Sequence, residues 1–168
     1  DHPSKEGNHI GPVVSDQQFK KVQILIQKGL DEGAKLIAGG TGKPEGFQKG
    51  YYVKPTVFAD VNNKMEIART EIFGPVLSII PFETEEEVVA RANDTEFGLA
   101  AYFFSRDVGR VMRVAENLEY GIVCSNSGVF STAGAPFGGW KQSGIGSEGG
   151  QEGIADFYET KFHSMGGI

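Results

Sequence analysis

The feature that most restricts the fold is an alternation of apolar strands and helices over residues 75–124. Residues 75–82, 99–104 and 122–124 are apolar enough for buried strands, and the first is nearly continuous, as expected when both faces of a strand are covered. Residues 107–118 have the pattern of a helix between the last two strands. Strands that alternate with helices predict a parallel α/β sheet with right-handed crossovers.

Two capping boxes predict where helices begin. Ser15 with Gln18, and Thr84 with Glu87, have the required three-residue spacing, and the first helix is expected to end near Glu32. The residues expected to face inward are Phe19, Val22, Ile26 and Leu30 in the first helix, Val88, Val89 and Ala92 in the second, and Val108, Val111, Met112 and Ala115 in the helix at 107–118.

The segment between the first helix and residue 75 contains shorter elements. Residues 35–38 are a strand candidate, and residues 65–70 are long enough for one helical turn. Residues 51–61 are rich in aromatic and β-branched side chains, so we expect them to be extended. Pro55 suggests that this strand lies at a sheet edge.

Loop chemistry dominates after the last buried strand. Residues 125–150 are dense in Gly, Ser and Pro, and a loop of this length is usually functional or disordered. Residues 149–156 have the pattern of a short helix, and residues 157–164 alternate like a terminal strand.

The charge and the absence of long apolar runs exclude several classes of function. A net charge of −6 disfavours a nucleic-acid or anionic-membrane surface, which would need clustered Lys and Arg. No apolar run has the roughly 18 residues needed to span a bilayer. We therefore expect neither nucleic acid nor membrane as a partner, and a cytoplasmic location. The polar, Pro-containing start without Met suggests a segment of a longer chain.

Residues 144–149 fit the pattern G-x-G-x-x-G of dinucleotide-binding loops. That fingerprint must follow a strand and open a helix, with an acidic residue about 20 positions later. Here the pattern follows a long loop and lies near the end of the chain, so a separate nucleotide-binding protein is disfavoured. The glycines indicate a backbone that turns sharply and packs closely.

Cysteine and histidine give no argument for a catalytic or metal site. Cys124 is the single cysteine and lies in an apolar strand, where a thiol behaves as a small hydrophobic side chain, so we interpret it as structural. The histidines at 2, 9 and 163 lack metal-ligand spacing, and we expect no metal.

Residues 71–75, Glu-Ile-Phe-Gly-Pro, connect the expected helical turn to the first buried strand. One interpretation is a loop whose Gly and Pro set the chain direction. The other is a cofactor site, because a carboxylate can accept hydrogen bonds from both ribose hydroxyls and a phenyl face can pack on a nicotinamide ring. The physical chemistry of these residues leaves both interpretations open.

A second motif, Pro-Phe-Gly-Gly-x-Lys-x-Ser-Gly at residues 136–144, follows the first after about sixty residues. This pair resembles the aldehyde dehydrogenase superfamily, and the segments 8–14, 50–57 and 96–105 are also similar to family segments in the same order. The resemblance covers essentially the whole chain. It implies an α/β fold: a three-layer, parallel-sheet portion of the catalytic domain over residues 1–155, and an oligomerisation strand or tail over residues 156–168.

The resemblance implies roles for individual residues. Glu71 would hold the ribose next to the nicotinamide of NAD or NADP, and Phe73 would limit the motion of the nicotinamide ring. Asn126 and the loop to Phe137 would line the aldehyde tunnel, with Phe137 as an aromatic wall. Glu148 matches a buried glutamate that serves either as a proton relay or as a structural acceptor for backbone N–H groups.

Within the superfamily, the stretches 119–123, 126–131 and 153–161 are similar to succinate-semialdehyde dehydrogenases. Phe130 and Ser131 would then bind substrate, with the Ser131 hydroxyl donating to the remote carboxylate in a charge-assisted hydrogen bond. The chain departs from the family at Ser147, where an arginine is usual. That departure puts the local ion pairing and the coupling between subunits in doubt.

The family mechanism needs a cysteine nucleophile, an oxyanion-stabilising Asn, a glutamate base and a Rossmann domain. In family members, all of these lie upstream of the segment that matches residue 1. We therefore expect no catalytic nucleophile or base in this chain and no activity from it alone. The resemblance implies an aldehyde substrate for the parent enzyme and a homo-oligomer. The alternative is a non-enzymatic truncated module that pairs with full-length subunits.

Overall fold

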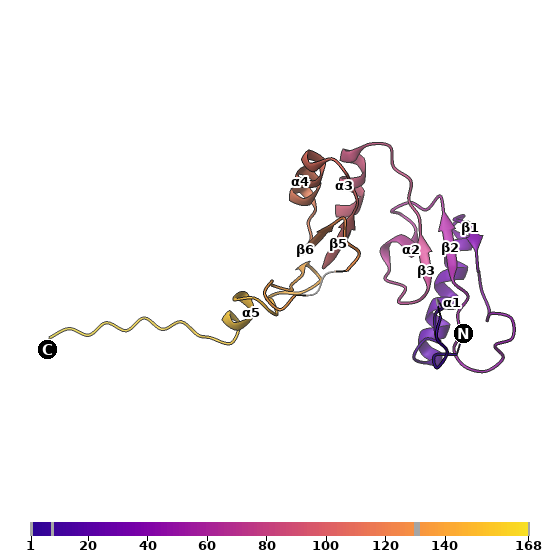
Figure 1. Cartoon of the computed structure of the whole chain (residues 1–168), viewed down its shortest axis with the longest axis horizontal. Coiled ribbons are helices and arrows are strands. Elements are labelled where there is room, and N and C mark those ends of the chain that lie inside the picture. Colours follow the sequence, from indigo (N-terminus) through magenta and orange to yellow (C-terminus); the bar gives the residue numbers. More distant parts are fainter. Residues whose placement is uncertain (1, 8, 130–131, 168) are drawn as a thin grey trace. The chain divides into compact units, whose positions relative to one another are not determined.

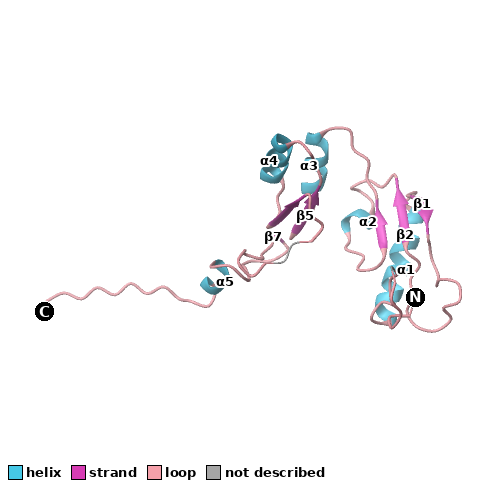
Figure 2. Cartoon of the chain, in the orientation of Figure 1, coloured by secondary structure: helices cyan, strands magenta, loops and turns pink. Residues whose placement is uncertain are grey.

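The computed structural model describes residues 2–7, 9–129 and 132–167, and the chain divides into two compact units, Asp1–Glu83 and Thr84–Ile168. Each unit combines helices with strands, as Figures 1 and 2 show. The predicted α/β class is therefore confirmed, and each unit is described by itself below.

The first unit is built on a three-stranded sheet in the order β1-β2-β3. Strand β2 (Thr56–Ala59) pairs antiparallel with β1 (Lys35–Ala38) and parallel with β3 (Val76–Ser78). The expectation that Pro55 marks an edge strand is wrong, because β2 is central. Pro55 lies just before the strand, where it removes no hydrogen bond from the ladder.

Helix α1 (Asp16–Asp31) covers one face of this sheet and begins as the capping box predicts, with the Ser15 hydroxyl accepting from the Gln18 N–H at 3.1 Å. The helix ends before Gly33, whose φ of +86° favours glycine. The short helix α2 (Glu66–Arg69) confirms the expected turn. The core joins both helices to the sheet through Val22, Leu25, Ile26, Phe58, Val61, Ile67 and Ile72.

The expectation that both faces of the strand at 75–82 are covered is wrong within this unit. Phe58 is fully buried and pairs in register with Ser78, whereas the neighbouring pair Val57 and Leu77 points to the other face. Leu77 is 57% exposed. An apolar run shows that a strand can be covered on both faces, but the helices of this unit cover only one.

The second unit contains a parallel crossover: β5 (Ala100–Phe103), α4 (Val108–Asn117) and β6 (Ile122–Ser125). Helix α3 (Glu85–Asn93) begins at the predicted Thr84 cap and lies beside α4. Glu85 accepts hydrogen bonds from Arg110 Nε at 3.0 Å and Arg113 Nε at 2.9 Å. These bonds, chiefly the one from Arg113, lower the pKa of the Glu85 carboxyl.

Two sequence predictions are corrected here. Strand β3 pairs with β2 in the sheet of the first unit, and β5 pairs with β6 in a sheet of the second. A strand's apolarity does not identify its hydrogen-bonding partner. The inward face of α4 is predicted only in part. Val114 and Leu118 are buried and the predicted Val111 and Ala115 are half-buried, whereas Val108 and Met112 are 76% and 57% exposed.

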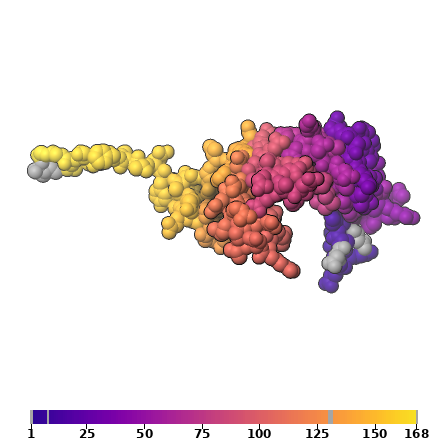
Figure 3. Space-filling view, turned by 90° about the horizontal axis from the view of Figure 1, so that it is seen from above, coloured from indigo at the N-terminus to yellow at the C-terminus, as the bar shows by residue number. Residues whose placement is uncertain are grey.

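The remaining elements are short. Strand β4 (Phe97–Gly98) pairs antiparallel with β7 (Trp140–Lys141), neither of which the sequence predicted, and α5 (Glu152–Ala155) confirms the expected short helix. Residues 157–164 are not a strand. They are exposed and belong to the narrow yellow extension in Figure 3. A strand needs a hydrogen-bonded neighbour, and no described part of the chain supplies one.

Within the described ranges, no helix is both long and apolar enough to cross a bilayer.

Candidate functional site

The loop at residues 71–75 lies against the first helix. Gln18 Nε2 donates to the Phe73 carbonyl at 2.6 Å and to the Ile72 carbonyl at 3.3 Å, and Lys21 Nζ donates to the Glu71 carbonyl at 3.1 Å. Gly74 packs so closely on the helix that an added Cβ would lie 2.7 Å from Val22 Cγ2. Side chains of α1 therefore hold the loop in place.

Phe73 has a left-handed backbone conformation, with φ of +58°. For a non-glycine residue such a conformation costs on the order of 1–3 kcal/mol and persists only where the surroundings impose it. The side chain is nevertheless 70% exposed, so burial of the ring does not provide the compensation. Strain that presents an aromatic ring to solvent is typical of a ligand-contacting position.

The Glu71 side chain is exposed beside that ring along the chain. Its backbone carbonyl is bonded to Lys21, whereas its carboxylate has no hydrogen-bond or ion-pair partner within the described part of the chain. A carboxylate with its acceptor sites free can bind two neighbouring hydroxyl groups. The interpretation that the Gly and Pro of this loop only set the chain direction leaves this carboxylate without a role.

Asn126, predicted to line a substrate tunnel, has both its side-chain polar atoms bonded to the backbone of Ser105. Its Oδ1 accepts from the Ser105 N–H at 2.9 Å, and its Nδ2 donates to the Ser105 carbonyl at 2.8 Å. Its φ is +57°, a region that Asn adopts more readily than most residues. The amide thus fixes where the long loop leaves β6.

Replacing Asn126 tests the contribution of its two hydrogen bonds to stability. We expect Asn126→Ala to lower the free energy of unfolding by about 1.5–3 kcal/mol, since two hydrogen bonds are lost and alanine disfavours positive φ. Asn126→Gly loses the same bonds but accepts the conformation, so it should lose less. Urea denaturation of both variants measures the difference. Equal stability of Asn126→Ala and the parent would contradict a structural role for the two hydrogen bonds between Asn126 and Ser105.

The other two predicted substrate residues, Phe130 and Ser131, lie outside the described residues. Cys124, which the sequence indicated to be structural, is a free cysteine buried in β6 opposite Tyr102. Across the ranges that the structure describes, no three His, Cys, Asp or Glu side chains group as they would around a metal ion.

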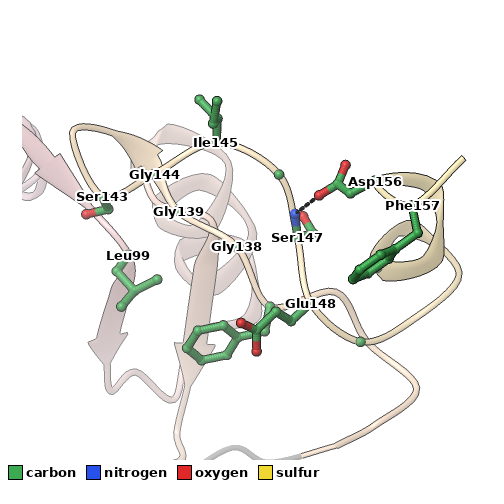
Figure 4. Close-up of a pocket in the computed structure, with 14 residues that line it drawn as sticks. Leu99, Gly138, Gly139, Ser143, Gly144, Ile145, Ser147, Glu148, Asp156 and Phe157 are labelled. Atoms are coloured by element: carbon green, nitrogen blue, oxygen red, sulfur yellow. Dashed lines mark hydrogen bonds between the residues drawn. The ribbon is translucent and has the colours of Figure 1, made fainter. Parts of the chain in front are cut away.

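The glycine-rich loop of the second unit lines an open cavity of about 470 Å³. An isolated antiparallel bridge joins two predicted site residues there: the Phe137 N–H donates to the Glu148 carbonyl at 2.6 Å, and the Glu148 N–H donates back at 2.8 Å. The wall, drawn in Figure 4, includes Leu99, Phe137, Ser147, Glu148, Asp156 and Phe157. The structure thus brings Phe137 and Glu148 together from segments 11 positions apart.

Glu148 is exposed on this wall, so the burial that the resemblance implies for it is not found in the chain as described. Its carboxylate accepts no backbone N–H from the described residues. Burial of a carboxylate needs covering segments, and the second unit leaves this side of the loop open. The proton-relay and structural-acceptor interpretations both remain predictions.

Ser147 replaces the arginine that the family pattern led us to expect. Its N–H donates to Asp156 Oδ2 at 3.1 Å, as Figure 4 shows, so a backbone contact joins the loop to the end of α5. Among the described residues that line the cavity, Glu148 and Asp156 contribute carboxylates and none has a basic side chain.

The glycines at 144, 146 and 149 all have positive φ, and an added Cβ at Gly149 would lie 2.9 Å from the Ala135 carbonyl oxygen. The loop follows the two-residue antiparallel strand β7 and precedes a helix of one turn. These observations confirm that the G-x-G-x-x-G pattern serves sharp turns and close packing.

Lys141 connects three segments of the second unit. The sequence placed this lysine in the motif but did not predict these contacts. Its Nζ donates to the carbonyls of Asn93 and Thr95 at 2.8 and 3.2 Å, and pairs with Glu119 Oε2 at 2.6 Å. Nearby, burial raises the pKa of Tyr120, whose hydroxyl donates to the Ala92 carbonyl at 2.7 Å. The lysine of the glycine-rich motif therefore fixes its loop to α3.

A family model described as "Aldehyde dehydrogenase family" matches residues 1–163 of this chain. A curated relative, a putative aldehyde dehydrogenase of Staphylococcus saprophyticus, is 47% identical over 160 residues, which are 95% of this chain and 34% of the relative. The chain spans about a third of the length of the curated relatives it matches.

Solved structures similar to this chain are also aldehyde dehydrogenases. An aldehyde dehydrogenase from Bartonella henselae is 55% identical with a TM-score of 0.88, covering 94% of this chain and 33% of that one. One from Mycobacterium tuberculosis, complexed with NAD+, is 49% identical with a TM-score of 0.84, covering 88% and 30%. A succinate-semialdehyde dehydrogenase from Burkholderia pseudomallei is 47% identical with a TM-score of 0.84, covering 92% and 31%.

Proposed function

The chain belongs to the aldehyde dehydrogenase family, and from that premise we propose that it is part of an enzyme that oxidises an aldehyde to a carboxylic acid with NAD or NADP. Its contribution is the contact with the ribose and nicotinamide of the cofactor and one wall of the aldehyde site. The observation that carries this proposal is the loop at 71–75, where a strained, exposed Phe73 follows a Glu71 carboxylate that pairs with no described residue.

The residues present fit such a cofactor. The Glu71 carboxylate is free to accept hydrogen bonds from the two ribose hydroxyls, and the exposed face of Phe73 limits the motion of the nicotinamide ring. When bound, the nicotinamide supplies the acceptor for a hydride from the substrate. The related enzyme from Mycobacterium tuberculosis was solved with NAD+, which supports this class of cofactor.

We assign the substrate as an aldehyde that carries a remote carboxylate, with succinate semialdehyde the best candidate. Support comes from the similarity to the Burkholderia pseudomallei enzyme and from the hydroxyl that the sequence offers at Ser131. Phe137, on the wall of the cavity, supplies an apolar surface for the carbon chain. Asn126 acts through its two hydrogen bonds to the Ser105 backbone, which fix the direction of the loop that carries Ser131 and Phe137.

The isolated chain is expected to have no dehydrogenase activity. Its single cysteine is buried in β6, where its thiol cannot reach an aldehyde in solution. We assign the exposed segment 157–164, with Phe157 and Phe162 at 85% and 90% exposure, to pairing with another subunit. Turnover by the purified chain that disappears in Cys124→Ser would overturn the first expectation.

The test of the cofactor role is made in the complete enzyme that contains this segment. Glu71→Gln should lower kcat/KM for the cofactor by roughly 10- to 150-fold, as expected for about 1.5–3 kcal/mol from hydrogen bonds to a charged group. The matched control is Glu45→Gln, another exposed glutamate of the first unit, which should leave the kinetics unchanged. Unchanged cofactor kinetics in Glu71→Gln would refute the assignment.

A further inference from the structure

We propose that Gln18 is a positioning residue for the cofactor loop, which holds Phe73 in its left-handed conformation and so fixes the ring that faces the nicotinamide. This inference rests on the proposed function. It adds a residue that lies 53 positions before Glu71 and whose side chain donates to the loop backbone.

The first support is where the Gln18 side chain donates. Gln18 occupies the third helical position of a capping box, from which the side chain usually returns to the N-cap backbone. Its N–H does bond to the Ser15 hydroxyl, but its Nε2 donates to the carbonyls of Ile72 and Phe73. The side chain therefore serves the loop, and the cap is completed by the backbone.

The second support is that the carbonyls on both sides of the strained residue are bonded by side chains rather than by the backbone. Among the described residues, no backbone N–H donates to the carbonyls of residues 71–73. Those carbonyls are bonded instead by Gln18 and Lys21, which lie three positions apart on one face of α1. The conformation of the loop thus depends on helix side chains.

The third support is the strain at Phe73 itself. Its φ of +58° is disfavoured for an aromatic residue, and its exposed ring gains little from packing. The 2.6 Å bond from Gln18 ends on the carbonyl of this residue. On one side Ile72 is buried, and on the other Gly74 packs against Val22, so both neighbours are fixed and the central residue is held by Gln18.

The experiment compares Gln18→Met with Gln17→Met. Methionine keeps the length of the side chain and its helix propensity but cannot donate, and Gln17 is the exposed neighbour on the same helix. In the 168-residue chain, the NMR order parameter of the Phe73 amide should fall from about 0.85 to below about 0.6 in Gln18→Met. It should stay unchanged in Gln17→Met.

In the complete enzyme, Gln18→Met should raise KM for the cofactor roughly 2- to 12-fold, the effect of a hydrogen bond, and a Phe73→Gly background should abolish that increase. An unchanged order parameter would overturn the positioning role whatever the kinetics. A lower order parameter with unchanged cofactor KM would support the role of Gln18 in positioning the loop and would overturn the proposed contact between Phe73 and the cofactor. The two measurements therefore distinguish failure of the positioning role from failure of the proposed function.

Discussion

Gly121→Ala is expected to lower the free energy of unfolding of the second unit by about 2–3 kcal/mol, the range for inserting a group into a packed region. An added Cβ at this position would overlap the carbonyl oxygen of Gly138 and lie 3.3 Å from the Cα of Gly139. The obstacle is backbone, so no side chain can rotate to make room. The methyl group would displace the motif that carries Phe137.

The single tryptophan, Trp140, belongs to this unit and lies next to Gly139, so its fluorescence during urea denaturation reports on the unit in question. Gly128→Ala is the matched control, because an added Cβ there has no atom within 4 Å and the φ is not in the left-handed region. A Gly121→Ala midpoint equal to that of Gly128→Ala would show that the two backbones are not in contact.

Phe58→Ala is expected to have the largest effect in the first unit, about 3–5 kcal/mol of unfolding free energy. Phe58 is fully buried in the central strand, and its ring lies close to Gly29 of α1. Truncation leaves a cavity between helix and sheet, and that helix also carries the side chains that hold the loop at 71–75. The loss should therefore loosen the proposed cofactor site as well.

Hydrogen exchange at the amides of β1 and β2 follows this unit without signal from the other. The control is Phe162→Ala, which removes an equal side chain at 90% exposure and should change stability by less than about 0.5 kcal/mol. Protection factors in Phe58→Ala that match those of the control would contradict the assignment of Phe58 to the core.

The sequence by itself determined the elements whose cause is local. The caps at Ser15 and Thr84 are satisfied as predicted, because an N-cap hydroxyl needs only the N–H three residues later. The glycine-rich stretch turns where its glycines allow positive φ. The family also followed from the sequence, since its motifs are short runs of neighbouring residues, and the family model confirms it.

Tertiary structure alone decided the pairings and the directions of side chains. Pro55 precedes a central strand rather than an edge, and β3 pairs with β2, because a strand's composition does not encode its neighbour. The buried face of α4 turns toward Val114 and Leu118, which no periodicity distinguished from Val108 and Met112.

The same distinction separates two residues of the proposed site. Phe73 could be selected from the sequence as an aromatic beside a carboxylate, but its positive φ is imposed by contacts with a helix more than fifty residues away. Gln18 had a sufficient local explanation as a capping-box residue. Only the folded chain shows that its amide reaches the carbonyl of Phe73, because hydrogen bonds between distant segments depend on where packing of the core places them.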